Sequence, residues 1–443
     1  ELALSSWSQN PEVDHTIGRK LSDKYRFAEG ATYQRQALKF QADFLPARMQ
    51  LTQDLLRLGE DAEGWQLIDD VFQADGYNVV AHNLTTLHDR LQEYHVLKND
   101  SFLIRMEDRE ARLYGPQVLA LLNQAKETLC EKYDVTIDEP VVVEIFPQQK
   151  DFAVRTFGIP GADGFLGVCF GRVITANSPA ALGANYANWQ SVLWHEFCHV
   201  VTLQLTRNRM PRWLSEGISV YEERLADPRW GQPMTPDDRR RILEGELTPI
   251  AELSSAFLNP ETPGGIPFAY FQSSLVVEFL VETFGFDALL AVMDDLAAGL
   301  PINESLPRHT AEMAQLEAEF VDFARRKAEA VAPEVDWSTP DLGSLPSGEE
   351  RVARLRDWVA EHPHNWHGLT MLADLLIESE QWDEAREVLQ RMHELYPDYI
   401  GGDSPLLKLA SIARKLGDIP AERDALHRYA ALDADASETF LRL

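Results

Sequence analysis

The chain has 443 residues, enough for roughly two to four domains with buried cores, and its 45% hydrophobic and 25% charged residues are typical of a globular protein. The 71 acidic residues outnumber the 41 basic ones and give a formal net charge of −30, which argues against a nucleic acid or an anionic membrane as a partner. No run of about 18 apolar residues occurs, so we expect no membrane span.

Residues 1–100 have the pattern of paired helices. Ala37 and Val71 lie 34 residues apart, which is the period of a tetratricopeptide helix-turn-helix unit. The small residue expected in the second helix of such a unit is Gly64, which Trp65 follows. The segment therefore resembles a tetratricopeptide region, and we predict helices there.

Two strand patterns follow in the middle of the chain. The run VVVEIFP at 141–147 predicts a buried strand that ends at proline, and GFLGVCFGRVITA at 164–176 predicts a hairpin or an edge strand. From about 187 to 325 the spacing of apolar residues becomes helical. Strands first and helices after indicate an α+β domain. Four apolar residues of the second run are expected to pack within that strand: Phe165, Leu166, Val168 and Phe170.

The sequence HEFCH lies in the helical stretch WQSVLWHEFCHVVTLQL. Its two histidines, His195 and His199, are one helical turn apart and therefore on one face, where a single zinc ion can bind both imidazoles. Glu196 stands beside them and can accept a proton from a water that the metal activates. The spacing predicts one Zn²⁺ per chain; the alternative is two helix histidines brought together by chance.

A second helix is predicted from WLSEGISVYEE, which follows Pro211. A catalytic zinc site uses three protein ligands and leaves one position open, and Glu216 is the natural third ligand. Taken alone, Glu216 would be a solvated glutamate near a helix start. Glu223, two turns later on the same face, is either an acceptor that orients a ligating histidine or a surface charge.

Together, HEFCH and WLSEGISVYEE resemble the gluzincin metallopeptidases, the branch that contains thermolysin and aminopeptidase N. The resemblance implies that His195, His199 and Glu216 bind zinc. It implies that Glu196 is the general base. It covers about 101–330 and implies a thermolysin-like catalytic domain, a small mixed sheet plus a helical subdomain. Only 16 residues separate His199 from Glu216, fewer than in the best-known members, so we expect the connecting turn to differ.

The segment IPFAYFQSSLVVEFLVETFG at 266–285 resembles the helix of aminopeptidase N relatives that carries a catalytic tyrosine. Tyr270 holds the place near the helix start, and Gly285 closes the end. The resemblance implies that the Tyr270 hydroxyl stabilises the oxyanion of a tetrahedral intermediate. The alternatives are a buried aromatic residue at the helix start, or Tyr221 as the donor.

Aminopeptidases of this branch bind the free amino group of the substrate with an acidic residue near a glycine-rich strand. The corresponding run here, GFLGVCFG at 164–171, has no carboxylate. Its backbone N–H and C=O groups can still align an extended peptide. This departure favours an endopeptidase-like specificity.

The end of the chain is predicted to be helical again. Residues 331–348 contain Pro, Ser and Gly without helical periodicity, which predicts a linker. Residues 349–443 resemble tetratricopeptide repeats, and the alternative is a plain pair of helical hairpins. One repeat register is met by Leu372, Ala373, Leu376, Trp382, Ala385, Leu389 and Pro397. Repeats of this kind build concave faces, so we expect them to bind a protein partner or the substrate.

The remaining polar features carry little functional signal. The basic runs RNRMPR at 207–212 and DDRRR at 237–241 are expected to form ion pairs or solvated surface. Three cysteines cannot build a disulfide framework, and Cys198 is expected to be a buried thiol. Unpaired cysteines favour a reducing compartment, whereas a chain that starts at Glu1 favours a trimmed, exported form, so both the cytoplasm and an exported setting stay open.

The sequence thus predicts a zinc-dependent peptidase, a hydrolase that acts on a peptide or protein substrate, with domains at 1–100, 101–330 and 349–443. Two other functions use fewer of these features. A tetratricopeptide scaffold with an inactive peptidase-like domain has no physical need of Glu196. A zinc hydrolase acting on a non-peptide ester or amide uses the same metal chemistry on another bond.

Overall fold

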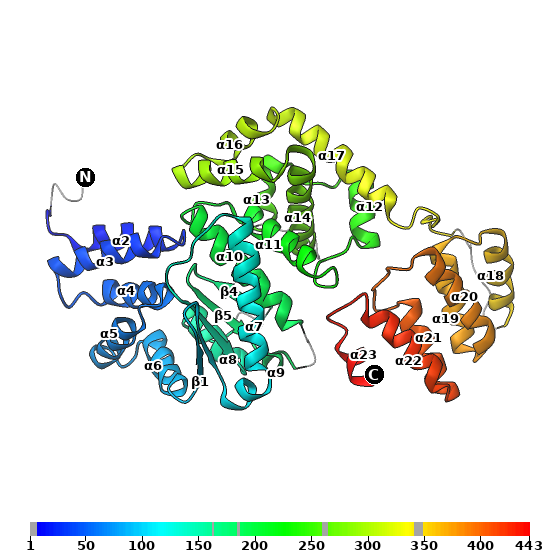
Figure 1. The fold of residues 1–443 in the computed structure, drawn as a ribbon, viewed down its shortest axis with the longest axis horizontal. Helices are drawn as coiled ribbons and strands as arrows, with labels where there is room; N and C mark the ends of the chain where they lie inside the picture. The colour runs from blue at the N-terminus through cyan, green and yellow to red at the C-terminus, as the bar shows by residue number, and fades with distance from the viewer. Residues whose placement is uncertain (1–6, 162–163, 184–186, 259–264, 341–348) are drawn as a thin grey trace. The chain divides into compact units, whose positions relative to one another are not determined.

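The computed structural model describes residues 7–161, 164–183, 187–258, 265–340 and 349–443 (Figure 1). The chain divides into two compact units. The first comprises Glu1–Ala226 and Thr248–Phe320, and the second comprises Asp227–Leu247 and Val321–Leu443. Among the helices described, none combines the length and the apolar character that crossing a membrane requires.

The first unit begins with helices that pack on one another in chain order. They are α2 (Pro11–Ser22), α3 (Phe27–Phe40), α4 (Leu45–Leu58), α5 (Asp61–Ala74) and α6 (Val79–Leu91). Side-chain oxygens of Asn10 and Asn78 accept backbone N–H groups at the starts of α2 and α6. Gly59 has a φ of 76° and ends α4. The helical prediction for this region is confirmed, and its likeness to tetratricopeptide repeats stays a prediction.

A small mixed sheet follows these helices. Its strands are β1 (His95–Lys98), β2 (Phe102–Met106), β3 (Val141–Phe146), β4 (Gly167–Cys169) and β5 (Val173–Asn177), in the order β1-β2-β3-β5-β4. The three central strands are parallel, and both edge strands are antiparallel to their neighbours. The predicted strand at 141–147 is the fully buried β3, and the predicted hairpin is β4 with β5. The sequence did not predict β1, because its four residues are mostly exposed and show no apolar alternation.

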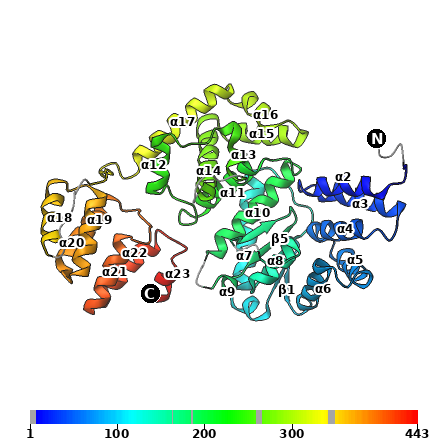
Figure 2. The same ribbon diagram turned by 180° about the vertical axis from the view of Figure 1, so that it is seen from behind.

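Helices cover the sheet, and one of them, α10, carries the two predicted histidine ligands. α7 (Asp108–Lys132) and α10 (Trp189–Leu205) pack on each other, and both contact the sheet (Figure 1). Phe102 of β2 meets Phe197 of α10 in this layer, with ring centroids 5.7 Å apart. α8 (Gln149–Phe157) contacts β3 and β5, and α6 packs on α8 (Figure 2). The short α9 (Pro179–Leu182) follows β5.

The rest of the first unit is helical, as the spacing from 187 to 325 predicts. Its further helices are α11 (Arg212–Ala226), η1 (Ile250–Glu252), α13 (Leu253–Ala256), α14 (Gly265–Phe284), α15 (Phe286–Ala298), α16 (Ile302–His309) and the first part of α17 (Met313–Ala330). α11 packs on α10 and on α14. The crossing with α14 is so close that a β-carbon at Gly217 would lie 2.6 Å from the backbone oxygen of Ser273. Glycine at this position therefore sets the spacing of two helices that carry site residues.

The second unit contains α12 (Pro236–Glu244), the end of α17, and α18 (Glu349–Glu361), α19 (Trp366–Glu378), α20 (Trp382–Leu395), α21 (Pro405–Leu416), α22 (Ile419–Ala430) and α23 (Ser437–Arg442). The helical pattern predicted for 349–443 is confirmed. Leu372, Ala373, Leu376, Ala385 and Leu389 of the predicted repeat register are each at most 2% exposed. Pro397 lies just beyond α20. Of the linker predicted at 331–348, residues 341–348 lie outside the described residues.

Candidate active site

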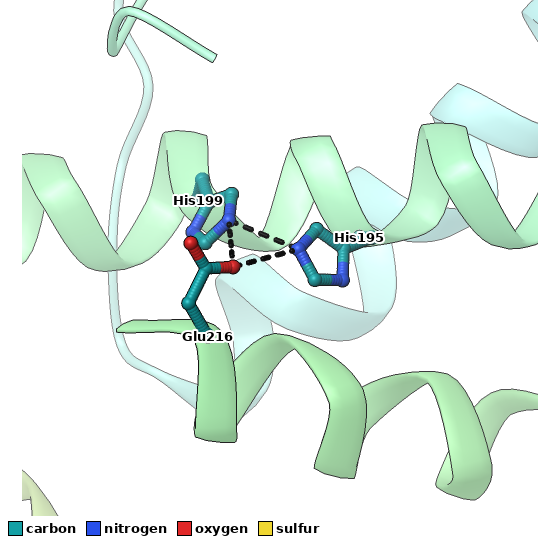
Figure 3. Close-up of side chains that lie close together, drawn as sticks. All are labelled: His195, His199 and Glu216. Carbon is teal, nitrogen blue, oxygen red and sulfur yellow. Dashed lines mark hydrogen bonds and ion pairs between the residues drawn. The ribbon is translucent and has the colours of Figure 1, made fainter. Parts of the chain in front are cut away.

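Three predicted metal ligands come together between α10 and α11. His195 and His199 lie one turn apart on α10, and their Nε2 atoms are 3.1 Å apart. The Glu216 Oε2 atom of α11 lies 3.3 Å from His195 Nε2 and 3.4 Å from His199 Nε2. Figure 3 shows the two rings and the carboxylate pointing at one another. This group could hold a metal ion.

The geometry of the group fits zinc. A tetrahedral zinc ion with ligand bonds of 2.0–2.2 Å holds its ligand atoms roughly 3.3–3.5 Å apart, close to the three separations of 3.1, 3.3 and 3.4 Å found here. Two imidazole nitrogens and one carboxylate oxygen are also donors that zinc takes. Only 11–16% of the surface of these side chains is exposed, so contacts with the surrounding protein fix their positions.

Further polar side chains occupy the other nitrogen of each histidine. Glu223 Oε1 lies 2.6 Å from His195 Nδ1, and its second oxygen accepts a hydrogen bond from the Ser191 hydroxyl. The hydroxyls of Ser215 and Ser219 lie 3.0 and 3.3 Å from His199 Nδ1. Because each Nδ1 has a partner, the two Nε2 atoms are left to face a common point.

Burial and hydrogen bonding set the charges of this group. Burial lowers the pKa of His195, but hydrogen bonds to Glu216 and Glu223 outweigh burial and raise that pKa well above its ordinary value. Burial raises the pKa of Glu216, whereas hydrogen bonds from His195 and His199 bring it well below its ordinary value. Glu216 is therefore an anionic oxygen donor at neutral pH.

Glu196 lies under the edge strand of the sheet. It is 6% exposed, and its Oε2 atom has no hydrogen-bond partner among the described residues. A β-carbon at Gly167 of β4 would lie 2.8 Å from the Glu196 carboxylate, so only glycine lets the strand approach this closely. Burial raises the pKa of Glu196, and the neighbouring histidines His199 and His195 oppose that rise. The result is a carboxylate of increased basicity with an unused oxygen.

Tyr270 stands at the start of α14 on the wall of the same cavity. Its hydroxyl lies 3.4 Å from Arg212 Nη2, and Arg212 Nε lies 3.3 Å from Glu216 Oε1. Burial, followed by the Glu216 charge, raises the pKa of Tyr270 to about 12, so the phenol keeps its proton at neutral pH. The alternative donor, Tyr221, is not among the cavity-lining residues described, and the Lys132 ammonium lies over its ring.

The cavity that contains these groups has a volume of about 1030 Å³. The turn between α2 and α3, strand β4, the turn between α10 and α11, and the turn between α15 and α16 all contribute to its wall. The expectation that Phe165 and Leu166 are packing residues is wrong, because they are 43% and 38% exposed, and Phe165 lines the cavity. Phe170 is buried as expected, and so is the Cys198 thiol.

A buried contact behind the site holds α11 against α7. The Lys132 ammonium and the Tyr133 hydroxyl each donate to Glu222 Oε1 at 2.7 Å. Glu222 precedes Glu223, so the same stretch of α11 that anchors the helix also supports His195. Sequence reasoning missed Glu222, the two serines at His199, and the glycines Gly167 and Gly217, because each acts through a neighbour distant in sequence.

Part of the chain matches a known protein family. Residues 124–321 match a family model described as the Peptidase MA superfamily, which is less than half of the chain. None of the curated proteins matches the chain. The matched segment contains α10, α11 and α14, and hence every candidate site residue. The match supports a peptidase MA-like domain over these residues.

Proposed function

We propose that the protein is a zinc-dependent peptidase whose metal is held by His195, His199 and Glu216. The observation that carries the proposal is the convergence of these three donor atoms at tetrahedral ligand spacing. The peptidase MA-like match over the same residues supports it independently. Zinc bound there would polarise a substrate carbonyl and bring the pKa of water toward neutrality.

The chain supplies the proton transfers and the charge stabilisation. We assign Glu196 as the general base, because its carboxylate is buried beside the metal ligands and has an unused oxygen. Glu196 takes a proton from the attacking water and delivers it to the leaving amine. Tyr270, protonated at neutral pH, donates a hydrogen bond to the carbonyl oxygen as it becomes an oxyanion. Glu223 orients His195 by accepting its Nδ1–H.

An extended peptide fits the open edge of β4. β4 pairs with β5 on one side and is the last strand of the sheet among the described residues, so its other edge can accept an added strand. Val168 and Gly167 of β4 line the cavity, and the run 164–171 contains no carboxylate that would bind a free amino terminus. We therefore propose endopeptidase-like cleavage. The helices at 1–100 and 349–443 would act as tetratricopeptide-like surfaces for a protein partner or the substrate.

The test starts with the metal. Purified wild-type chain should contain about one zinc per chain by elemental analysis, and Glu216→Ala should lose most of it. Glu196→Gln should keep the zinc, because the amide replaces a group that is not a ligand. Wild type should cleave a panel of unfolded proteins and peptides, and Glu196→Gln should be slower by about 10²–10⁴-fold.

The outcomes separate the proposal from its alternatives. A chain that takes up no zinc even when it is supplied would sink the metal site. If both wild type and Glu196→Gln bind zinc and do not differ on the protein and peptide panel, the scaffold alternative is supported. Cleavage of small esters or amides in place of peptides would support a different hydrolase.

A further inference from the structure

The cavity wall contains four basic residues against the three acidic ones Asp23, Glu196 and Glu216, although the chain as a whole is strongly acidic. Lys24, Arg26, Arg209 and Arg212 line the cavity, while the formal net charge of the chain is −30. Arg212 is engaged with Tyr270 and Glu216 beside the metal ligands. The other cations come from two turns that the proposed reaction does not use.

The turn between α2 and α3 brings in Lys24 and Arg26. The N–H of Arg26 bonds the Leu21 carbonyl at 3.1 Å, and Tyr25 between them has a φ of 60°. This position after a helix is usually glycine, because a side chain there costs about 1 kcal/mol. Tyr25 compensates by stacking on Phe170, with ring centroids 6.1 Å apart, which fixes the turn against the hairpin that carries β4.

The turn between α10 and α11 is built in a similar way and carries Arg209. The N–H of Asn208 bonds the Leu203 carbonyl at 2.9 Å, and Arg207 and Asn208 have φ values of 51° and 56°. Arg209 follows, and its Nη1 donates to the Ala297 carbonyl at 2.5 Å. Because that acceptor is neutral, the bond positions the guanidinium without cancelling its charge.

Carboxylates cancel only part of the charge at these turns. Asp23 pairs with Lys20 at 3.1 Å, and Arg26 pairs with Glu29 at 2.7 Å. Glu29 also lies within electrostatic range of Arg209. The charge at these turns is therefore positive by two, with four basic residues (Lys20, Lys24, Arg26 and Arg209) and two acidic ones (Asp23 and Glu29). In the part of the chain that the structure describes, no carboxylate lies at ion-pair distance from Lys24 or Arg209.

We propose that Lys24 and Arg209, which line the same cavity as the metal ligands, bind a carboxylate of the substrate, so that the cavity selects acidic peptide segments or a free C-terminus. The inference rests on the peptidase function proposed above. Within the run 207–212, Arg209 is exposed and Arg212 is ion-paired with Glu216, as the sequence predicts, and both residues also line the cavity. Apolar neighbours in the cavity wall, Phe165, Met210 and Ile302, would hold the uncharged part of the substrate.

The net charge of the chain predicts the opposite preference, which makes the test sharp. A field set by −30 charges favours basic peptides over acidic ones, whereas a local pair of cations favours acidic peptides. The rank order of peptide affinity therefore decides between the two.

The experiment measures binding to the zinc-loaded Glu196→Gln chain by fluorescence anisotropy. Four labelled peptides share one uncharged sequence: a neutral amidated form, an amidated form with one added Glu, the neutral form with a free C-terminal carboxylate, and an amidated form with one added Lys. We expect the Glu form, the free-acid form or both to bind roughly fivefold to tenfold tighter than the neutral form, and the Lys form to bind more weakly. Tight binding of only one of the two identifies the source of the carboxylate.

Variants added to this chain locate the effect. Lys24→Gln with Arg209→Gln should remove the preference for the acidic peptides over the neutral one. Arg207→Gln is the matched control, because it removes one positive charge from the same turn outside the cavity lining. Equal or absent binding of acidic and neutral peptides would overturn the inference. Cleavage by the wild-type chain is scored separately: a preserved acidic preference without any cleavage would sink the proposed function alone, and cleavage without the preference would sink the inference alone.

Discussion

The buried residues of the two compact units differ in kind. The first unit buries many ionisable side chains, among them Asp54, Glu144, Arg155, Glu196 and Glu223. In the described residues of the second unit the buried polar side chains are Asn365, Ser404 and Thr439, none of them charged. Asn365 caps α19 by accepting the Gly368 N–H. The Asn365 amide also donates to Asp336 and Ser338, so this residue ties the start of α19 to the preceding segment, and the core of the second unit is otherwise apolar.

The difference indicates what each region is built to do. Burying a charge costs several kcal/mol unless it is paired and hydrogen-bonded, so a fold that only needs to be stable has no use for one. Around α10 and α11 the buried charges converge on one point and leave an oxygen unused. In α18 to α22 the buried side chains are mainly apolar and pack the helices against one another. This contrast is consistent with the activity proposed for the first region and the docking role proposed for the second.

Breaking a buried ion pair should cause the largest stability loss. Glu144 is 0% exposed and pairs with Arg105 at 2.7 Å and Arg155 at 2.6 Å. Glu144→Ala leaves the buried Arg155 without a carboxylate and Arg105 with Asp61 alone, and we expect a loss of about 3–5 kcal/mol in the free energy of unfolding, measured with urea. The control in the second unit is Glu384→Ala, whose partner Arg356 is 43% exposed; its loss should stay below about 1 kcal/mol. Equal losses would remove the contrast between the units.

The apolar core of the second unit should respond to a cavity instead. Leu389 of α20 is 0% exposed, and Leu389→Ala should lower the stability of that unit by about 2–5 kcal/mol. Hydrogen exchange should then accelerate in α19 and α20, while zinc content should not change. Loss of zinc from this variant would show that the second unit also stabilises the metal site, which would contradict the division between the two units.

Alanine at a close helix contact should have different effects on stability in the two units. A β-carbon at Gly217 meets the Ser273 backbone at 2.6 Å, whereas one at Gly368 of the second unit meets the Trp358 ring at 2.4 Å. A ring can rotate and a helix backbone cannot, so Gly217→Ala should cost about 1–3 kcal/mol and weaken zinc binding by displacing Glu216. Gly368→Ala should be near neutral, because the gain in helix propensity of about 1 kcal/mol offsets the shift of Trp358. Zinc titration and urea unfolding of both variants test this.

The sequence predicted the part of the site that repeats with the helical period. His195 and His199 share a face because they are four residues apart, and the segment around Glu216 has a recognisable pattern. β3 was predictable from an unbroken β-branched run, and the apolar register of α19 and α20 from its spacing. Each of these signals is local.

What escaped prediction depends on contacts between distant segments. Ser215 and Ser219 look like ordinary helix serines until α11 is packed on α10. Tyr25 and Arg209 belong to turns about 180 residues apart in sequence, and both line one cavity. β1 is short and exposed, so it is a strand only because β2 pairs with it. No periodicity can report such neighbours.

The smallest effect concerns a buried charge that belongs to neither the site nor an ion pair. Asp54 of α4 is 0% exposed, and burial raises its pKa to about 6, although a hydrogen bond from Gln50 opposes the rise. An acid whose folded pKa is raised stabilises the fold below its unfolded pKa and loses that contribution as the pH rises through its folded pKa. Asp54→Asn keeps an acceptor for Gln50 and cannot ionise. The free energy of unfolding of this variant should match that of the wild type near pH 4 and exceed it by about 2 kcal/mol at pH 8 in urea unfolding, with the gain developing between pH 4 and pH 7.

The control is Asp374→Asn in the second unit. The Asp374 side chain is 50% exposed in its pair with Lys408, so this variant should show no such gain. A gain that does not depend on pH would mean that Asn packs better than Asp here and that the buried charge itself costs little, which would weaken the argument that buried carboxylates in the first unit are retained for function.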